Sequence, residues 1–271
     1  MPQGISIHVG LNGVDPDQYE GWDGKLNACE ADANDMEAIA KGHGFETHKL
    51  LTAEATAEAL TSAFDDAAGK LQSGDILLIS YSGHGGQVPD TNGDEDDRMD
   101  ETWVLYNRQV VDDELYAFWA KCAPGVRIAL YSDSCHSGTV ARGAVEAVGE
   151  DRVGQYRLKG MPDEYIQSVY QAHKDEYDAI QRSVPPLDSA DVKASVILTS
   201  GCQDNQTSLD GDKNGLFTQN LLQVWNDGHF RGGYRTFHKK IAQAMPPWQS
   251  PNFFTVGAGP GKFATQHPFT V

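Results

Sequence analysis

Three near-continuous apolar segments constrain the fold of this chain more than any other feature. They read DILLISYS at 75–82, VRIALYSD at 126–133 and SVILTSG at 195–201. Runs of this kind are typical of strands buried on both faces of a parallel sheet. Shorter strand patterns occupy 4–12, 45–51 and 103–106, and helical patterns occupy 28–44, 53–71, 112–121, 215–226 and 234–245. This alternation predicts an α/β fold with a mostly parallel central sheet and helices on both faces.

Two of these strands end in side chains that suit acyl-transfer chemistry. His84 follows the first apolar run within YSGHGG, and Cys135 follows the second within YSDSCHSG. The carboxyl ends of parallel strands meet at one edge of a sheet, and the segment between positions 84 and 135 is long enough for one crossover. A cysteine nucleophile needs a nearby base, because the thiolate is the reactive form. The pattern predicts Cys135 as nucleophile and His84 as its base.

Neighbouring residues add to this interpretation. The backbone amides of Gly85 and Cys135 are predicted to form an oxyanion hole. His136 is a rival base, but adjacent side chains of an extended segment point to different sides, which favours His84. No third side chain that would orient His84 is evident, so we expect a Cys–His dyad. For either motif alone, a tight turn or a buried structural cysteine is an open alternative.

The composition of the chain limits which cellular compartment and which classes of binding partner we expect. The formal net charge of −18 disfavours nucleic acid as a partner and is consistent with basic substrates or with solubility alone. The sequence has no apolar run long enough to span a membrane and no signal-peptide pattern, so we expect a cytoplasmic protein. The four cysteines, at 29, 122, 135 and 202, form no C-x-x-C pair, which disfavours a structural zinc site. The reducing cytoplasm expected for this protein also disfavours a disulfide framework.

The motifs together resemble those of a known family. YSGHG and DSCHSG, preceded by LNACEADANDM and followed by ILTSGCQDNQTS and GLFT, resemble the metacaspase branch of the caspase-like cysteine peptidases, whose prokaryotic members are called orthocaspases. The resemblance implies one caspase-like three-layer domain over 1–271 that acts as a monomer. Its large catalytic portion would be 1–140, its linker or insertion 141–194 and its small catalytic portion 195–271.

The resemblance also implies cleavage after Arg or Lys in protein or peptide substrates. It places Cys29, Asp32, Ser82 and Asp133 in the substrate pocket. Asp133 lies two positions before Cys135 and therefore shares its side of the strand end. Two carboxylates at a pocket floor would bind a basic side chain through charge-assisted hydrogen bonds and repel an acidic one. Without the resemblance, Asp32 would read as an exposed helix-start charge and Asp133 as a turn residue.

The segment between the two catalytic portions is rich in basic residues. Many caspase-like enzymes cut themselves there, so we expect self-cleavage by an enzyme specific for basic residues. Arg142-Gly143 and the YRLKG stretch are expected to be the most accessible sites. The candidate residues are Arg142, Arg152, Arg157, Lys159, Lys174 and Arg182.

Calcium is the one cofactor that the resemblance suggests, as an activator that the chemistry itself does not require. Its family aspartates match Asp100, Asp112 and Asp113, but Arg142 stands at the fourth position, which should weaken affinity for a hard dication. The acidic stretch 90–101 partly mimics a calcium loop, but Glu95 occupies the place of the sharp-turn glycine. We read that stretch as a solvated acidic loop.

Two other functions stay open. One is a peptidase of the same clan with another specificity, such as cleavage after Asn. The other is a non-catalytic caspase-like module that binds partners. The presence of both His84 and Cys135 disfavours the second alternative, because a degenerate site would be expected to lose one of them.

Overall fold

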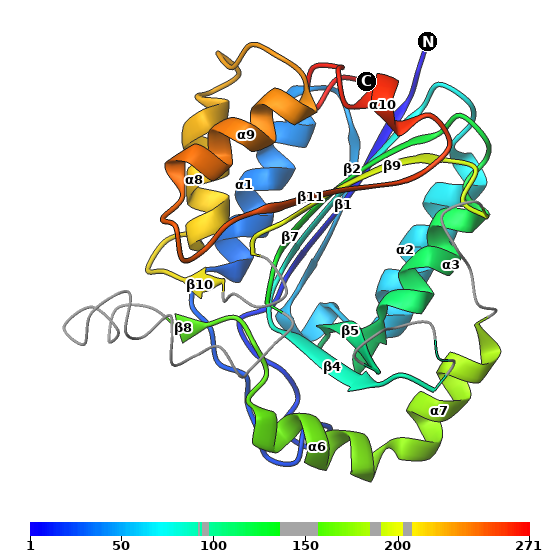
Figure 1. The fold of residues 1–271 in the computed structure, drawn as a ribbon, viewed down its shortest axis with the longest axis vertical. Coiled ribbons are helices and arrows are strands. Elements are labelled where there is room, and N and C mark those ends of the chain that lie inside the picture. The colour runs from blue at the N-terminus through cyan, green and yellow to red at the C-terminus, as the bar shows by residue number, and fades with distance from the viewer. Residues whose placement is uncertain (92, 94–97, 136–156, 185–190, 203–207) are drawn as a thin grey trace.

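A six-stranded sheet forms the centre of the computed structural model, which describes residues 1–91, 93, 98–135, 157–184, 191–202 and 208–271 (Figure 1). Its strands are β1 (Gly4–Gly10), β2 (Glu46–Leu51), β3 (Ile76–Ser82), β7 (Arg127–Asp133), β9 (Ser195–Ser200) and β11 (Asn252–Gly257). Their spatial order is β11-β9-β7-β3-β1-β2. All neighbours pair in parallel except β11, which runs antiparallel to β9. The carboxyl ends of five strands therefore meet at one edge.

Helices cover both faces of this sheet. One face carries α1 (Cys29–Gly42), α8 (Leu216–Trp225) and α9 (Tyr234–Ala244), and the other carries α2 (Ala57–Lys70) and α3 (Asp112–Lys121) (Figure 1). A short 3₁₀ turn, η1 (Thr52–Glu54), precedes α2, and α10 (Pro260–Phe263) lies near the C-terminus. This arrangement confirms the predicted three-layer α/β fold.

The side chains of β3 show why both faces of the sheet must be covered by helices. Leu77 and Ile79 pack into the cluster beneath α2 and α3, which includes Phe64. The alternate residues Ile76 and Leu78 pack into the opposite cluster with residues of α8 and α9. Successive side chains of a strand point to opposite faces, so a continuous apolar run needs apolar partners on both sides.

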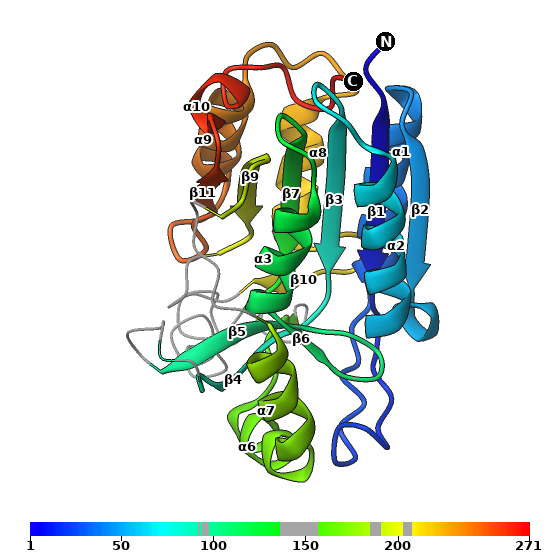
Figure 2. The same cartoon turned by 90° about the vertical axis from the view of Figure 1, so that its right-hand side faces the viewer.

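A second layer of structure lies beyond the carboxyl edge of the sheet (Figure 2). It contains the antiparallel strands β4 (Gly85–Pro89), β5 (Met99–Val104) and β6 (Gln109–Val111), and the helices α6 (Asp163–Ala172) and α7 (Lys174–Ser183). The two-residue strands β8 (Arg157–Leu158) and β10 (Leu209–Asp210) pair with each other antiparallel. A third apolar cluster, which includes Val88, Met161 and Tyr177, ties this layer together.

Several predicted elements need correction. The expected single helix at 53–71 is interrupted, because η1 ends at Glu54 and the Thr56 hydroxyl accepts a hydrogen bond from Ala59 N to begin α2. The strand expected at 103–106 lies earlier, as β5. The described part of the segment 141–194, which was expected to be a linker or insertion, contains β8, α6 and α7.

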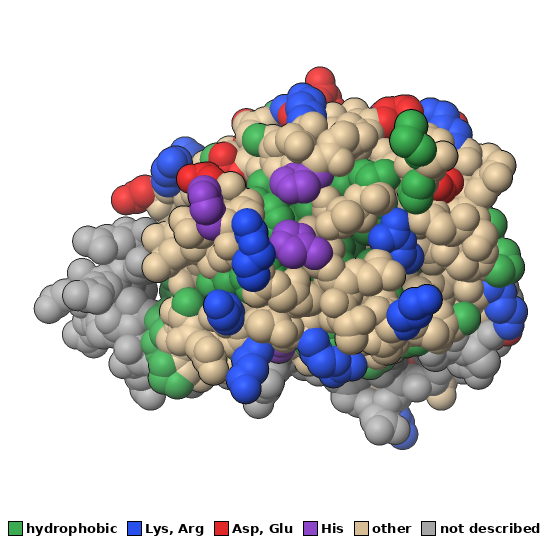
Figure 3. Space-filling model, turned by 90° about the horizontal axis from the view of Figure 1, so that it is seen from above, with side chains coloured by type: hydrophobic (Ala, Val, Ile, Leu, Met, Phe, Trp, Pro, Cys, Tyr) green, Lys and Arg blue, Asp and Glu red, His purple; other side chains and the backbone are tan. Residues whose placement is uncertain are grey.

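Charge is distributed unevenly over the chain. Residues 226–271 contain five lysines and arginines but a single acidic residue, Asp227, although the whole chain carries −18. Figure 3 looks onto the end of the molecule where the two termini lie, and shows Lys, Arg and His side chains across the middle of that face. The excess negative charge therefore belongs to the rest of the molecule. None of the described helices has the length and apolarity that crossing a membrane requires.

Candidate active site

His84 lies directly between β3 and β4, at the carboxyl edge of the sheet. Its Nε2 atom is 3.0 Å from the carbonyl oxygen of Gly24, so the imidazole donates through Nε2. Nδ1 is buried and has no hydrogen-bond partner within the described part of the chain. The backbone of Gly24 has a positive φ of 53°, and a Cβ there would crowd Val14 and the His84 ring. A backbone carbonyl thus orients the base, a role that side-chain motifs could not reveal.

The surroundings keep His84 neutral. Burial lowers the pKa of His84 to about 4, while the carbonyl of Gly24 and, less strongly, the backbone of Gly160 raise it. Trp22 contacts the imidazole edge-on, with ring centroids 4.7 Å apart, and itself stacks on Tyr165 of α6. A neutral imidazole with Nε2 protonated leaves Nδ1 as the basic atom.

Cys135 follows the end of β7 by two residues and is fully buried. Its backbone N–H donates a hydrogen bond of 3.1 Å to the carbonyl oxygen of Lys159. The Gly85 N–H donates to the same oxygen at 3.0 Å. These are the two amides expected to form an oxyanion hole, and one carbonyl of the chain itself lies between them.

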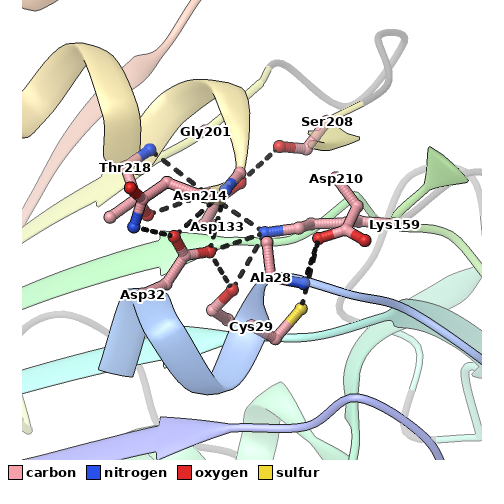
Figure 4. A network of polar contacts seen from close by, with 12 residues as sticks. Ala28, Cys29, Asp32, Asp133, Lys159, Gly201, Ser208, Asp210, Asn214 and Thr218 are labelled. Carbon is pink, nitrogen blue, oxygen red and sulfur yellow. Dashed lines mark hydrogen bonds and ion pairs between the residues drawn. The ribbon is translucent and has the colours of Figure 1, made fainter. Parts of the chain in front are cut away.

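The side chain of Lys159 fills an acidic pocket beside this carbonyl (Figure 4). Its Nζ lies 3.1 Å from Asp32 Oδ2, 3.1 Å from Asp133 Oδ2 and 2.9 Å from Ser82 Oγ. An ammonium has three N–H donors, so these three acceptors satisfy it completely. Cys29 lies at the same pocket (Figure 4), where its buried Sγ is 3.9 Å from Asp210 Oδ1. The structure thus brings together the four residues expected in the substrate pocket.

Further residues hold the two carboxylates in place. Asp32 accepts hydrogen bonds from the Asn214 side chain and from Gly215 N, both at 3.0 Å. Asp133 accepts from Ser208 Oγ at 2.5 Å and from Thr218 Oγ1 at 2.8 Å. Buried carboxylates need such donors, because an unsatisfied buried charge is costly.

Asp210 is a pocket residue that the sequence interpretation missed. Its carboxylate accepts hydrogen bonds from Asn27 N at 2.6 Å and Ala28 N at 3.1 Å, at the start of α1. It also lies near the Cys29 thiol and raises the pKa of Lys159. Asp210 is the first residue of the motif DGDKNG at 210–215, and this acidic residue was the available signal in the sequence.

The electrostatics of the pocket favour a buried cation. Burial by itself would lower the pKa of Lys159, but Asp133, Cys29, Asp32 and Asp210 raise it well above its ordinary value. Burial raises the pKa of Asp32 to about 6, and Lys159 opposes that shift. At neutral pH the buried Lys159 therefore keeps its charge as an ammonium.

The backbone around Lys159 is extended and pairs with a neighbouring backbone segment on each side. β8 pairs with β10, and Lys159 N donates to Ser208 O at 3.0 Å. On the other side, Gly160 pairs with Gly85 and Met161 N donates to Gly85 O at 2.8 Å. This is strand addition, a common mode of peptide recognition, made here by the chain to itself. The expectation that the YRLKG stretch would be highly accessible is wrong for Lys159, which is fully buried.

Asp100, Asp112 and Asp113, the residues suggested for calcium, all lie in the described part of the chain. No group of three or more His, Cys, Asp or Glu side chains suited to a metal ion occurs there, Asp100, Asp112 and Asp113 included. His136 and Arg142 lie outside the described residues. All four cysteines are buried and no disulfide joins them.

Comparison with known proteins agrees with this geometry. A protein of Geobacter sulfurreducens of known crystal structure is 52% identical, with a TM-score of 0.91 over 100% of this chain and 99% of that one. Caspase-1 from Spodoptera frugiperda shares the fold at 14% identity, with a TM-score of 0.57 over 95% of this chain and 90% of that one.

Sequence relatives point to the same family. Metacaspase-1A of Neurospora crassa is 31% identical over 76% of this chain and 51% of its own length, and metacaspase-1 of Mycosarcoma maydis is 28% identical over 79% and 59%. The chain thus spans between half and two thirds of the length of these two relatives. The caspase domain model matches residues 14–259, which confirms the resemblance inferred from the motifs. The chain belongs to the caspase domain family of cysteine peptidases and is a relative of the metacaspases.

Proposed function

We propose that this peptidase cleaves peptide bonds after Lys or Arg. The observation that carries the proposal is the position of Lys159, whose ammonium lies between two buried carboxylates while its carbonyl accepts from two backbone amides. A basic residue of a substrate would occupy the same place. An Asp residue would be repelled there, and an Asn residue would leave both carboxylates without a cation.

The chemistry follows from the atoms at the site. The Cys135 sulfur attacks the carbonyl carbon, and Nδ1 of His84 accepts the thiol proton. The amides of Gly85 and Cys135 stabilise the oxyanion of the tetrahedral intermediate. His84 then donates the proton to the leaving nitrogen, and water hydrolyses the resulting thioester. The Gly24 carbonyl holds the imidazole of His84 in the tautomer that these reaction steps require.

The charge distribution supports basic substrates. The acidic excess lies outside the C-terminal portion, and the pocket itself combines Asp32, Asp133 and Asp210 around one cation. A field of this sign attracts cationic peptides and raises their encounter rate. Protein and peptide substrates with basic residues are therefore the proposed partners.

Reporter peptides test the specificity. Purified protein is assayed with reporters that are identical except for Lys, Arg, Asn or Asp before the scissile bond, after the Lys159 segment has been displaced or cut. We expect turnover of the Lys and Arg reporters and none in the Cys135→Ala variant. Turnover of the Asn reporter alone would favour a peptidase that cleaves after Asn. No turnover of any reporter would favour a non-catalytic caspase-like module that binds partners.

We further propose that the enzyme cuts its own Lys159–Gly160 bond. Lys159 is in the pocket, its carbonyl is held by the two amides, and Gly160 lies beside His84. Intact-mass measurement should detect a fraction of parent chains broken after Lys159 and none in Lys159→Gln. The matched control is Lys174→Gln, which changes an exposed lysine of α7 and should leave the cut unchanged. Cuts elsewhere in both variants would contradict this site.

Calcium activation stays a prediction of the family resemblance. The assay that tests it compares Lys-reporter turnover in calcium with turnover in excess chelator. Equal rates would remove calcium from the regulation of this enzyme. Arg142 at a position where the family has an aspartate leads us to expect a weak response.

A further inference from the structure

We propose that the site also carries out the reverse reaction on its own chain, so that the nitrogen released at Gly160 reseals the bond to Lys159. This inference rests on the proposed cleavage after Lys159. It assigns the enzyme a peptide-transfer activity in addition to hydrolysis. The reason is that the structure anchors both sides of the scissile bond.

The side after the scissile bond is held by the apolar cluster of the lower layer. The Met161 side chain is fully buried there, among residues that include Val88 and Tyr177. Its N–H donates to Gly85 O at 2.8 Å, next to the oxyanion amide of the same residue. Cleavage at Lys159–Gly160 breaks neither contact, so the new amine stays at the site.

Helices α6 and α7 continue this anchor. Ile166, Val169 and Tyr170 of α6 belong to the same cluster as Met161. In α7, Tyr177 is buried, and its hydroxyl accepts a hydrogen bond from Gln109 N at 3.1 Å. Gly160 therefore lies at the end of a folded unit rather than at the end of a free peptide.

The side before the scissile bond is held as firmly. Lys159 keeps its three polar contacts in the pocket, and its N–H donates to Ser208 O. Arg157 donates through Nη1 to Lys25 O at 2.8 Å. The same chain leads back to Cys135, so a thioester between Cys135 and Lys159 would be an internal ring.

The chemistry balances without any further reactant. In the forward step the bond from Cys135 sulfur to the Lys159 carbonyl carbon forms, the bond from that carbon to Gly160 nitrogen breaks, and His84 moves the thiol proton to that nitrogen. In the reverse step the neutral Gly160 amine attacks the thioester carbon, the carbon–sulfur bond breaks, and the proton returns through His84 to sulfur.

Anchoring decides between the two fates of the thioester. In hydrolysis of a separate substrate, the amine diffuses away and water is the remaining nucleophile. Here the amine stays in place, and oriented intramolecular groups react as if at roughly 10⁵ M or more. Resealing should therefore outcompete water, and the parent chain should stay mostly intact even though it forms the thioester repeatedly.

An added amine should divert the thioester, which gives a direct test. The probe is the dipeptide amide Gly-Met-NH₂, which copies residues 160–161, and its control is the N-acetylated form, which has no free amine. After incubation, mass spectrometry should find residues 1–159 extended by Gly-Met-NH₂ with the free dipeptide only. The yield should rise with dipeptide concentration and be absent in Cys135→Ala.

A variant pair tests the role of the anchor. Met161→Ala loosens the amine side and should increase the sum of transferred and hydrolysed product at least tenfold. Val111→Ala removes a comparable side chain from the same cluster, on β6 rather than beside the scissile bond, and should stay near the parent. Equal increases in both would mean general loosening of the cluster and would overturn the anchoring role of Met161.

The outcomes separate this inference from the proposed function. If Lys reporters are turned over but Lys159 ends only in a free carboxylate, or is never attacked, the resealing inference is wrong and the proposed specificity stands. If no Lys reporter is turned over either, the proposed specificity for basic residues is wrong, and the resealing inference that rests on it is wrong too.

Discussion

Lys159 Nζ lies 3.1 Å from Asp133 Oδ2, and both side chains are almost fully removed from solvent. Asp133 is the last residue of β7 and is in register with Ser82, the last residue of β3. Because residues paired in register point to the same face of a sheet, the two strands together present a carboxylate and a hydroxyl to one cation. These two polar groups of the pocket therefore lie on the sheet edge rather than on a loop.

Removal of one pocket carboxylate should weaken the binding of basic residues. We expect Asp133→Asn to lower kcat/KM for Lys reporters by roughly 10- to 100-fold, since a hydrogen bond to a charged group contributes about 1.5–3 kcal/mol. Asp65→Asn, which neutralises a half-exposed acid paired with Lys121 on the surface, is the control and should change little. Equal losses in both variants would show a general charge effect instead.

A methyl group added at Gly215 should fill the pocket. A Cβ there would overlap Asp133 Oδ2 and Lys159 Nζ, so Gly215→Ala should abolish turnover of Lys reporters while the fold persists. Gly69→Ala is the matched control, because Gly69 lies in α2 with open space around its Cβ position. That variant should retain activity and gain about 0.5–1 kcal/mol of stability. Normal reporter turnover in Gly215→Ala would contradict the pocket assignment.

Exposure of His84 should change the pH dependence of catalysis. The base must be neutral, and its pKa of about 4 in the buried site keeps it neutral in mildly acidic solution. Trp22→Ala removes the ring that packs against the imidazole, so the pKa of His84 should rise toward 6.5. As the pH is lowered, the variant should then lose activity at a higher pH than the parent. The pH profile of kcat/KM for a Lys reporter measures this shift. Phe254→Ala, an exposed aromatic on β11, should leave the profile unchanged.

A second histidine should govern acid stability. His8 is buried on β1 between Ser80 Oγ at 2.8 Å and Ser6 Oγ at 2.9 Å, and burial lowers its pKa from 6.5 to about 3. Between those two pH values the unfolded chain binds the extra proton, so stability falls by up to ~1.4 kcal/mol for each unit of falling pH.

Replacement of His8 by Gln removes this titration and keeps polar atoms near both serines. Urea unfolding of parent and His8→Gln between pH 6.5 and 4 should show a flatter dependence for the variant. Parallel curves for the two proteins would mean that His8 contributes nothing to acid unfolding.

Much of the framework could be predicted from the sequence because its signals are local. The apolar runs at β3, β7 and β9 each need two covered faces, and α3 was predicted with its observed bounds. The positions of His84 and Cys135 at neighbouring strand ends follow from the same pattern. Asp32 and Asp133 were expected together, and the structure places them around one ammonium.

The remaining features depend on contacts between distant segments. Gly24 orients His84 through a carbonyl that every residue type possesses, so no residue pattern marks it. Lys159 was one of six basic candidates, and the pairing of β8 with β10, a contact between distant segments, helps to place it in the pocket. Asp210 reaches the start of α1 from far along the chain. Monomeric state and cytoplasmic location stay predictions.

The separation of charge along the chain has a kinetic consequence. A basic peptide in solution approaches through the field of the acidic part of the molecule, and dissolved salt screens that field over about 8–10 Å. Lys159 makes no such approach, because it already lies between the carboxylates. Raising the ionic strength should therefore slow the capture of external peptides while leaving the reaction of the chain with itself almost unchanged, which makes a simple salt series able to tell the two apart.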